Sequence, residues 1–434
     1  MAFDRYGQLR PSGDAKWLRS ESEALARTCP FSPVAPDEDQ IAAELYPDAP
    51  RYGTIGRFLS AHVGYVASEG FRDRGSSGGM VSWVLDELMR QNLIDGAAHV
   101  VAVVPRAGDS MAADANLEDR FFRYRISRSS EQIYQGAKSR YYPVETSEIL
   151  DEINRTPGRY AIVGVPCFIK AIQLLRRQDP VLRERIAYTL GLFCGHMKSA
   201  RFVESFAIQM GVPIEEVAAV EFRVKDPSRP ASTYTAQLTL RDGSVHKRDW
   251  WNLVDGDWGS GFFQYEACNY CDDVIGETAD ISFGDAWLEP YSSDGRGTNV
   301  VVTRSAEIDH LVRAAIEEGR LQLSAVDEDF VVETQAAGFR QRREGLAYRL
   351  TWRKRGLKPR KRVDPDVPSS RRRSLIYRTR AVISRWSHRM FWISKYLKTP
   401  RIFTSWSKGM VSFYHGFAYS RGKLGQMFDR MGLK

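Results

Sequence analysis

The chain has few cysteines, no long apolar run and no internal repeat. Five cysteines among 434 residues are too few for the disulfide framework of a small secreted domain. No stretch approaches the roughly 18 consecutive apolar residues that span a bilayer, and the polar first 14 residues predict no signal peptide. We therefore expect a cytoplasmic protein. The hydrophobic fraction of 43% is sufficient for a folded core and excludes a wholly disordered chain.

Acidic side chains are scarce at one end of the chain. Residues 340–434 include 26 Lys and Arg but only 4 Asp and Glu. The rest of the chain has 36 basic and 50 acidic residues. An acidic body therefore precedes a strongly basic tail, and the net charge of +8 hides this asymmetry.

The body alternates helix-like and strand-like patterns. Residues 81–89 and 169–177 repeat apolar side chains at helical spacing. Short apolar runs predict buried strands, and three alternating segments predict a small antiparallel unit. The strands are expected at 99–105, 160–165, 186–193, 279–283 and 299–303, and the antiparallel unit at 218–224, 233–240 and 244–250. The predicted fold class is α/β (α+β), with a mixed-sheet body, a small antiparallel unit and a basic helical C-terminal tail.

Four of the five cysteines occupy positions that suit a metal centre. Cys167 and Cys194 each follow a predicted strand, and sites are commonly built at strand ends of α/β sheets. Cys268 and Cys271 form a Cys-x-x-Cys. Four thiolates from these positions can bind an iron–sulfur cluster or a structural zinc ion. Spacing alone leaves iron, zinc and ordinary buried thiols open.

The residues around these cysteines resemble one family. Three segments carry the resemblance in order, namely 164–171, 191–199, and 268–272 continued by 279–287. Together they resemble the coenzyme F420 hydrogenase/dehydrogenase beta-subunit family, which includes the plant-type 7-hydroxymethyl chlorophyll a reductase. The resemblance covers residues 50–335 and implies an oxidoreductase with FAD beside a [4Fe–4S] cluster. It assigns the cluster to Cys167, Cys194, Cys268 and Cys271.

The resemblance also implies a flavin-binding segment. The family's Ser-Gly-Gly segment matches Ser76, Ser77, Gly78 and Gly79, and its Gly-Ser-Lys-Tyr segment matches residues 136–139 less well. Backbone amides at a glycine-rich helix start can face a phosphate or a flavin carbonyl. Lys138 would place positive charge near the N1–C2=O end of the flavin. An ordinary helix N-terminus is the alternative interpretation of the glycines.

Two further residues are candidates. His196 follows Cys194, and we expect it to donate a hydrogen bond to the cluster or to carry a proton to the flavin, unless it is simply a packed histidine. Asp285 follows a predicted strand and is expected to orient the loop around the cofactors or to form a turn. His196 and Lys138 are the candidate catalytic residues. Cys29 is set aside, because one cysteine cannot hold a second cluster.

The tail contains a basic amphipathic segment. Residues 374–397 place apolar side chains near one helical face, with arginines between them. These apolar residues are Leu375, Val382, Ile383, Trp386, Met390, Ile393 and Leu397. The pattern favours an anionic membrane surface or a partner protein as the ligand of residues 374–434. Docking on the acidic body is an alternative, and nucleic acid is unlikely because no segment of the body resembles a nucleic-acid module.

We expect five parts: an N-terminal extension (1–50), an N-terminal flavin-binding part (51–145), a C-terminal iron–sulfur/flavin domain (146–335), a basic linker (336–373) and a basic amphipathic tail (374–434). The protein would move electrons between FAD, the cluster and an unidentified redox carrier or small-molecule substrate. Coenzyme F420 or another hydride carrier is a candidate. The alternative is a zinc-stabilised or cofactor-poor scaffold that docks at the inner face of a membrane through its tail.

Overall fold

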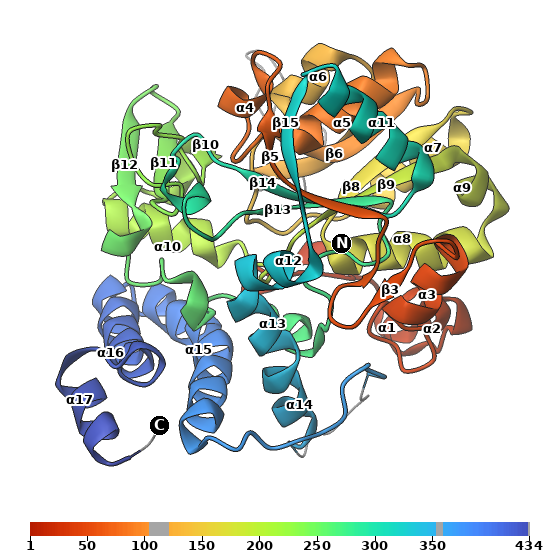
Figure 1. Ribbon diagram of the computed structural model, residues 1–434. Coiled ribbons are helices and arrows are strands. Elements are labelled where there is room, and N and C mark those ends of the chain that lie inside the picture. Colours follow the sequence, from red (N-terminus) through yellow and green to blue (C-terminus); the bar gives the residue numbers. More distant parts are fainter. Residues whose placement is uncertain (104–120, 353–358, 433–434) are drawn as a thin grey trace.

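A mixed eight-stranded sheet forms the centre of the protein (Figure 1). The computed structural model describes residues 1–103, 121–352 and 359–432. The strand order is β15-β5-β14-β13-β9-β8-β6-β7, where β6, β8, β9 and β13 are parallel and the other pairs are antiparallel. The strands are β5 (Ser60–Val66), β6 (Gly96–Ala102), β7 (Phe122–Ser127), β8 (Tyr160–Gly164), β9 (Ile186–Leu192), β13 (Ile281–Asp285), β14 (Asn299–Thr303) and β15 (Leu321–Val326). The predicted mixed sheet is confirmed; the last two residues of the expected strand at 99–105 lie outside the described residues.

Helices cover both faces of this sheet. Successive strand residues point to opposite faces, so Ala97 and Ala161 pack with one set of helices and Ala98 and Ile162 with another. The first set is α5 (Met80–Arg90) and α11 (Ala306–Glu317), and the second is α7 (Ser147–Arg155), α8 (Pro166–Gln178) and α9 (Pro180–Arg185). The strands in the middle are buried on both sides, which explains their continuous apolar runs.

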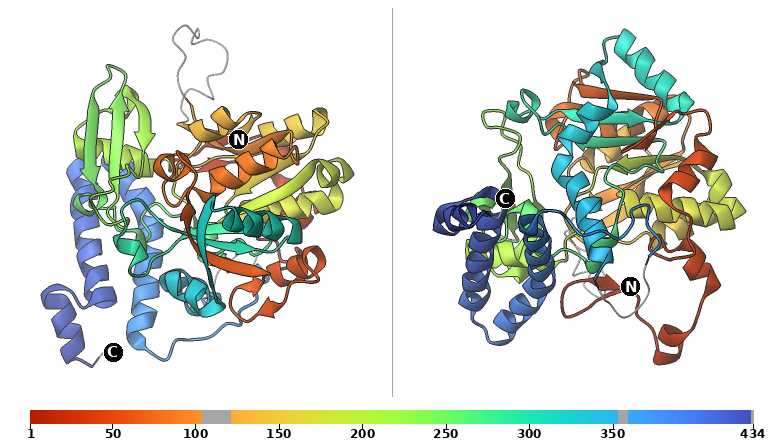
Figure 2. Two further views of the ribbon diagram at one scale, coloured as in Figure 1. Left: turned by 45° about the horizontal axis from the view of Figure 1, so that its top comes forward. Right: turned by 60° about the horizontal axis from the view of Figure 1, so that its bottom comes forward.

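The predicted antiparallel unit is a three-stranded sheet beside the main one. Its strands are β10 (Val217–Glu221), β11 (Thr235–Leu240) and β12 (Val245–Asp249), and it packs with α10 (Arg201–Met210). The tail forms α15 (Arg371–Tyr396), α16 (Pro400–Tyr419) and α17 (Gly422–Arg430). Figure 2 shows α15 and α16 side by side near the small sheet. Their buried aromatic residues share one core with this unit, so the tail docks on the body.

The stretch expected to be a basic linker has defined structure over much of its length. It includes α13 (Ala336–Arg342) and α14 (Glu344–Leu350), which follow α12 (Glu328–Thr334). Further on, Lys361 and Arg362 reach buried carboxylates of the body. Lys361 Nζ lies 3.0 Å from Asp272 Oδ1, and Arg362 lies 2.6 Å from Glu277 Oε2. The composition of the stretch shows that it is basic but not which carboxylates its side chains reach. Residues 353–358 of the stretch lie outside the described residues.

No helix in the described ranges is long and apolar enough to cross a membrane. The longest helix, α15, has charged residues distributed along its whole length.

Candidate functional site

The four cysteines predicted to bind the cluster lie near one another. Cys167 is in the first turn of α8, and Cys194 follows β9. Because β8 and β9 are parallel neighbours, their carboxyl ends bring these two residues to the same edge of the sheet. Cys268 lies in the short 3-10 helix η4 (Glu266–Tyr270), and Cys271 follows it. Three segments far apart in the sequence therefore supply one set of thiols.

These thiols lie deep in the protein and yet remain accessible. Each cysteine keeps some accessible surface, while burial raises the pKa of every one of the four thiols, that of Cys271 to about 11. Besides burial, the other three thiols raise the pKa of Cys167, with Cys271 contributing most. Deep thiolates that repel one another need a cationic group between them, and a metal centre fits this donor set.

Two kinds of metal centre take four thiolates. Among the described residues, no group of three or more His, Cys, Asp or Glu side chains is arranged to hold a single metal ion. One zinc ion needs all of its thiolates at about 2.3 Å from a common centre. In a four-iron cluster each iron takes one thiolate, so the sulfur atoms stand farther apart. Four thiolates can serve as the ligands of either centre.

Arg342, at the end of α13, stands beside the thiols and was not predicted. Its guanidinium donates to the carbonyl oxygens of Cys194 and Gly195, the latter at 2.7 Å. Burial lowers the pKa of Arg342, whereas the nearby thiols raise it by a larger amount, with Cys271 contributing most. The pKa of Arg342 is therefore raised overall. The backbone N–H of Met197 also points at Cys268 Sγ, at 3.4 Å. Both donors stabilise negative charge on the sulfur atoms.

His196 lies at the thiol end of a row of aromatic rings. Its ring stacks on Trp258 with centroids 4.2 Å apart, and Trp258 lies 4.9 Å from the ring of Tyr141. Burial holds the pKa of His196 well below its usual range, and the charges of Lys198 and Arg380 lower it further. His196 Nε2 is buried and has no partner among the described residues. The imidazole is therefore neutral, with one nitrogen free to bond.

The two predicted flavin segments meet in the structure. The backbone N–H of Ser139 donates to Ser76 Oγ at 2.8 Å. Lys138, on the same segment, pairs with Glu221 at 2.7 Å. The sequence places these segments 60 residues apart, and the fold joins them beside the first turn of α5.

Lys225 is a second functional candidate that sequence reasoning missed. Its ammonium donates to the carbonyl oxygens of Arg72, Ser77 and Arg296, at 2.9 Å for Ser77. Burial lowers its pKa to about 8, and the nearby charges of Lys138 and Arg72 add to this shift. The positive charges of Lys138 and Arg72 therefore lie near that of Lys225, which suits a phosphate-bearing ligand. The residue follows β10, and no motif marks it.

The glycines of the flavin segment have a packing role of their own. A Cβ atom on Gly78 would lie 2.8 Å from the carbonyl oxygen of Gly64, and Gly79 begins α5 with a φ of 88°. The N–H of Met80 already donates to Asn299 Oδ1, at 3.2 Å. Close approach of the chain therefore explains Gly78 and Gly79, and the first helical amide is not free to face an anion.

Asp285 binds a cation in the same region. Its carboxylate accepts from Arg223 at 2.9 Å, and Arg223 lies 4.3 Å from the ring centroid of Tyr234. The backbone carbonyl of Asp285 accepts from Gln335 at 2.8 Å. Asp285 thus ties the end of β13 to the small sheet, and this position is compatible with the predicted orienting role.

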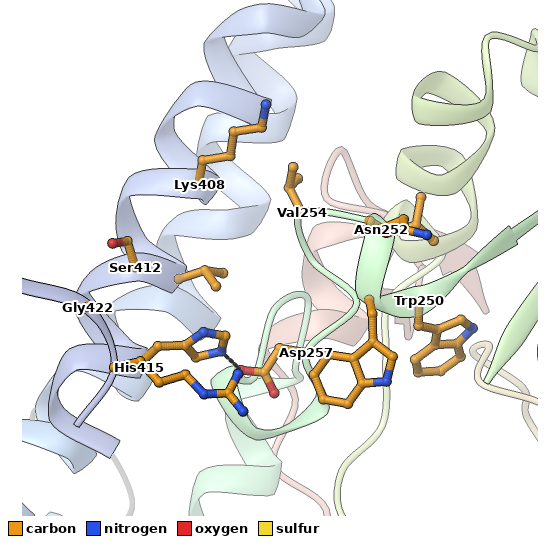
Figure 3. A pocket seen from close by; sticks show the side chains of 12 residues that line it. Trp250, Asn252, Val254, Asp257, Lys408, Ser412, His415 and Gly422 are labelled. Carbon is orange, nitrogen blue, oxygen red and sulfur yellow. Dashed lines mark hydrogen bonds and ion pairs between the residues drawn. The ribbon is translucent and has the colours of Figure 1, made fainter. Parts of the chain in front are cut away.

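A separate pocket lies where the tail meets the body (Figure 3). Its volume is about 480 Å³, and its lining comes from the 250–257 segment, α16 and the start of α17. His415 Nε2 lies 2.8 Å from Asp257 Oδ2 across it, and Asp257 precedes Trp258 in the chain. The predicted site residues do not line this pocket in the described part of the chain.

Comparison with known proteins identifies the class. Residues 61–151 match the N-terminal model, and residues 158–329 the C-terminal model, of the coenzyme F420 hydrogenase/dehydrogenase beta subunit. Hydrogenases and dehydrogenases, after which these two models are named, are oxidoreductases. Because the two matches together span more than half of the chain's length, the chain belongs to the coenzyme F420 hydrogenase/dehydrogenase beta-subunit family. The resemblance seen in the three cysteine-containing segments is confirmed.

Two individual proteins are similar to this chain. The coenzyme F420-dependent sulfite reductase of Methanocaldococcus jannaschii is 25% identical over 248 residues, which are 54% of this chain and 34% of that protein. The chain therefore spans about a third of that relative's length. A chain from the F420-reducing [NiFe] hydrogenase complex of Methanosarcina barkeri is 16% identical, with a TM-score of 0.49 over 68% of this chain and 92% of that chain.

Proposed function

We propose that the protein is an iron–sulfur flavoprotein that moves electrons between FAD, a [4Fe–4S] cluster and a hydride carrier or small-molecule substrate. The convergence of four deep thiols from three distant segments carries the proposal. The name of the Methanocaldococcus relative makes coenzyme F420 the first carrier to test. Another hydride carrier would fit the same chemistry.

The chain offers two binding regions for the cofactors. Cys167, Cys194, Cys268 and Cys271 would each give one thiolate to the cluster. Lys225, whose three N–H groups donate to backbone carbonyls, would place positive charge near the phosphates of FAD, and Ser76 and Lys138 lie beside it. A flavin, when bound, accepts two electrons together and releases them singly, which suits a neighbouring cluster.

Aromatic side chains occupy the path between these regions. Tyr141 lies two residues after Ser139, and its ring contacts Trp258. Trp258 contacts His196, which lies two residues after Cys194. The His196 and Trp258 rings are stacked, and the Trp258 and Tyr141 rings are tilted against each other. We propose that Lys138 and His196 act at opposite ends of this path, Lys138 by placing charge at the flavin and His196 by offering a nitrogen near the cluster.

Purification without oxygen tests the proposal directly. We expect about four irons, four sulfides and one FAD per chain, with the visible absorption of a cluster. Cys268→Ser should lose most of the cluster absorption and iron while flavin stays bound. Cys29→Ser is the matched control, because Cys29 follows a short N-terminal helix and is not one of the four thiols; it should keep both. About one zinc per chain without iron or flavin would contradict the proposal and favour the zinc-stabilised scaffold.

A further inference from the structure

Helix α15 docks on the body through a face that is mostly small or polar. The buried side chains of this face recur every three or four residues and are Tyr377, Ile383, Ser384, Ser387, His388, Phe391 and Ser394. Ser387 Oγ accepts from the backbone N–H of Phe263 at 2.9 Å. The small serine side chains let the helix approach the body closely. This face of α15 is therefore buried against the body, and the opposite face is exposed to solvent.

The opposite face has large apolar side chains at the surface. Val382 is 44% exposed, Trp386 42%, Trp392 36%, Tyr396 75% and Leu397 53%. At 3.6 residues per turn these positions fall on one side of the helix, away from the docking face. They extend over 15 residues, which is about 22 Å of helix. A contiguous apolar strip of this kind on a surface indicates an interaction site.

Cations lie between these apolar residues. Arg378, Arg385, Arg389 and Lys395 are exposed, and the Arg389 guanidinium lies 5.1 Å from the ring centroid of Trp386. The body supplies two carboxylates, since Arg385 pairs with Glu266 at 3.3 Å and Lys395 pairs with Glu204. Residues 371–419 themselves contain no Asp or Glu. The face therefore keeps a positive surplus.

We infer that the outer face of α15 (Val382, Trp386, Arg389, Trp392, Tyr396 and Leu397) lies on an anionic lipid surface. Tryptophan and tyrosine rings suit the depth of the headgroups, and arginine and lysine contact lipid phosphates. The exposed apolar strip distinguishes this ligand from nucleic acid, which requires cations but not Val382 or Leu397. The inference does not depend on which cofactors the body binds.

Flotation of the full chain with vesicles tests this inference. We expect the protein to float with vesicles of equal parts phosphatidylglycerol and phosphatidylcholine, and about tenfold less with phosphatidylcholine alone. Raising the salt to about 1 M should weaken binding, since the Debye length falls to about 3 Å. The double variant Trp386→Ala/Trp392→Ala should lose about tenfold in partitioning. Its far-UV spectrum should match the wild type and its melting temperature should stay close to it, because both side chains are exposed, although the contact of Trp392 with the Arg5 guanidinium, 5.7 Å from the ring centroid, is lost.

Two further variants complete the test. Arg389→Glu should weaken flotation through charge alone, while Trp251→Ala should leave it unchanged, because the exposed Trp251 lies away from α15 on another segment. Absence of flotation with the anionic vesicles would overturn the inference. Equal flotation of the wild type and the double variant would also overturn it.

Discussion

Replacement of Arg342 by glutamine is expected to lower the reduction potential of the proposed cluster. The guanidinium is buried, it donates to the carbonyl oxygens of Cys194 and Gly195, and the thiols raise its pKa. It therefore stays charged, and a fixed positive charge favours the state that holds the extra electron. Glutamine keeps a hydrogen-bond donor at this position but removes the charge, so the change isolates the electrostatic contribution.

The size of the shift follows from Coulomb's law. A unit charge about 7 Å from the added electron, at an effective dielectric constant of about 20, contributes roughly 2 kcal/mol. For a one-electron couple, about 1.4 kcal/mol corresponds to about 59 mV, so the potential should fall by roughly 0.1 V. A redox titration under nitrogen, followed by electron paramagnetic resonance, measures it.

Two controls make this result interpretable. Arg342→Lys keeps the charge and should stay near the wild-type potential. Arg340→Gln removes an exposed charge from the same helix and should shift the potential by much less, because solvent screens it. If Arg342→Gln binds its full complement of iron and titrates within about 20 mV of the wild type, the electrostatic role assigned to Arg342 is wrong.

Two other substitutions address the flavin region and the linker. Lys225→Met should weaken FAD binding by about tenfold, measured by fluorescence titration of flavin-free protein, because it removes the central cation of the site. Because the pKa of Lys225 is lowered to about 8, its charge is lost as the pH rises past about 8, and FAD affinity should fall there. Lys225→Arg should remove this pH dependence. A wild-type affinity that does not change with pH would count against the assignment. Arg362→Ala should reduce the free energy of unfolding in urea by about 3–5 kcal/mol, because it leaves buried Asp272 and Glu277 short of a cation. The exposed Arg360 provides the control, since Arg360→Ala should change the free energy of unfolding by less than about 0.5 kcal/mol. An equally small effect of Arg362→Ala would show that the buried ion pairs contribute little to stability.

Local sequence predicts those parts of this fold whose signal is local. Most strands that are buried on both faces have apolar runs, as in β14, and were predicted. The buried strand β5 was not predicted, because His62 and Gly64 interrupt its apolar pattern. The outer strands β7 and β15 alternate apolar residues with Arg123, Arg125, Gln322 and Ser324, and their pattern is too weak to separate from a loop. The four cysteines were found because the residues around each of them are characteristic of the family.

The remaining features depend on tertiary packing. Arg342 and Lys225 act through neighbours that are distant in sequence, so no local pattern marks either residue. In the tail, hydrophobic periodicity identified an apolar face that includes Trp386 and Leu397. The helix instead docks through Ser384, Ser387 and their neighbours, because small side chains permit close contact without contributing hydrophobicity.

The ion pairs of Lys361 and Arg362 redefine where the redox unit ends. Arg362 links Asp39 of the N-terminal extension to Glu277, and Lys361 pairs with Asp272, which directly follows Cys271. The family match stops at residue 329. A fragment cut there would lack these two cations as well as Arg342, and Asp272 and Glu277 beside Cys271 would lose their ion-pair partners. We therefore expect a stable fragment to extend at least to residue 362, because Arg362 joins the N-terminal extension to the loop that follows Cys271.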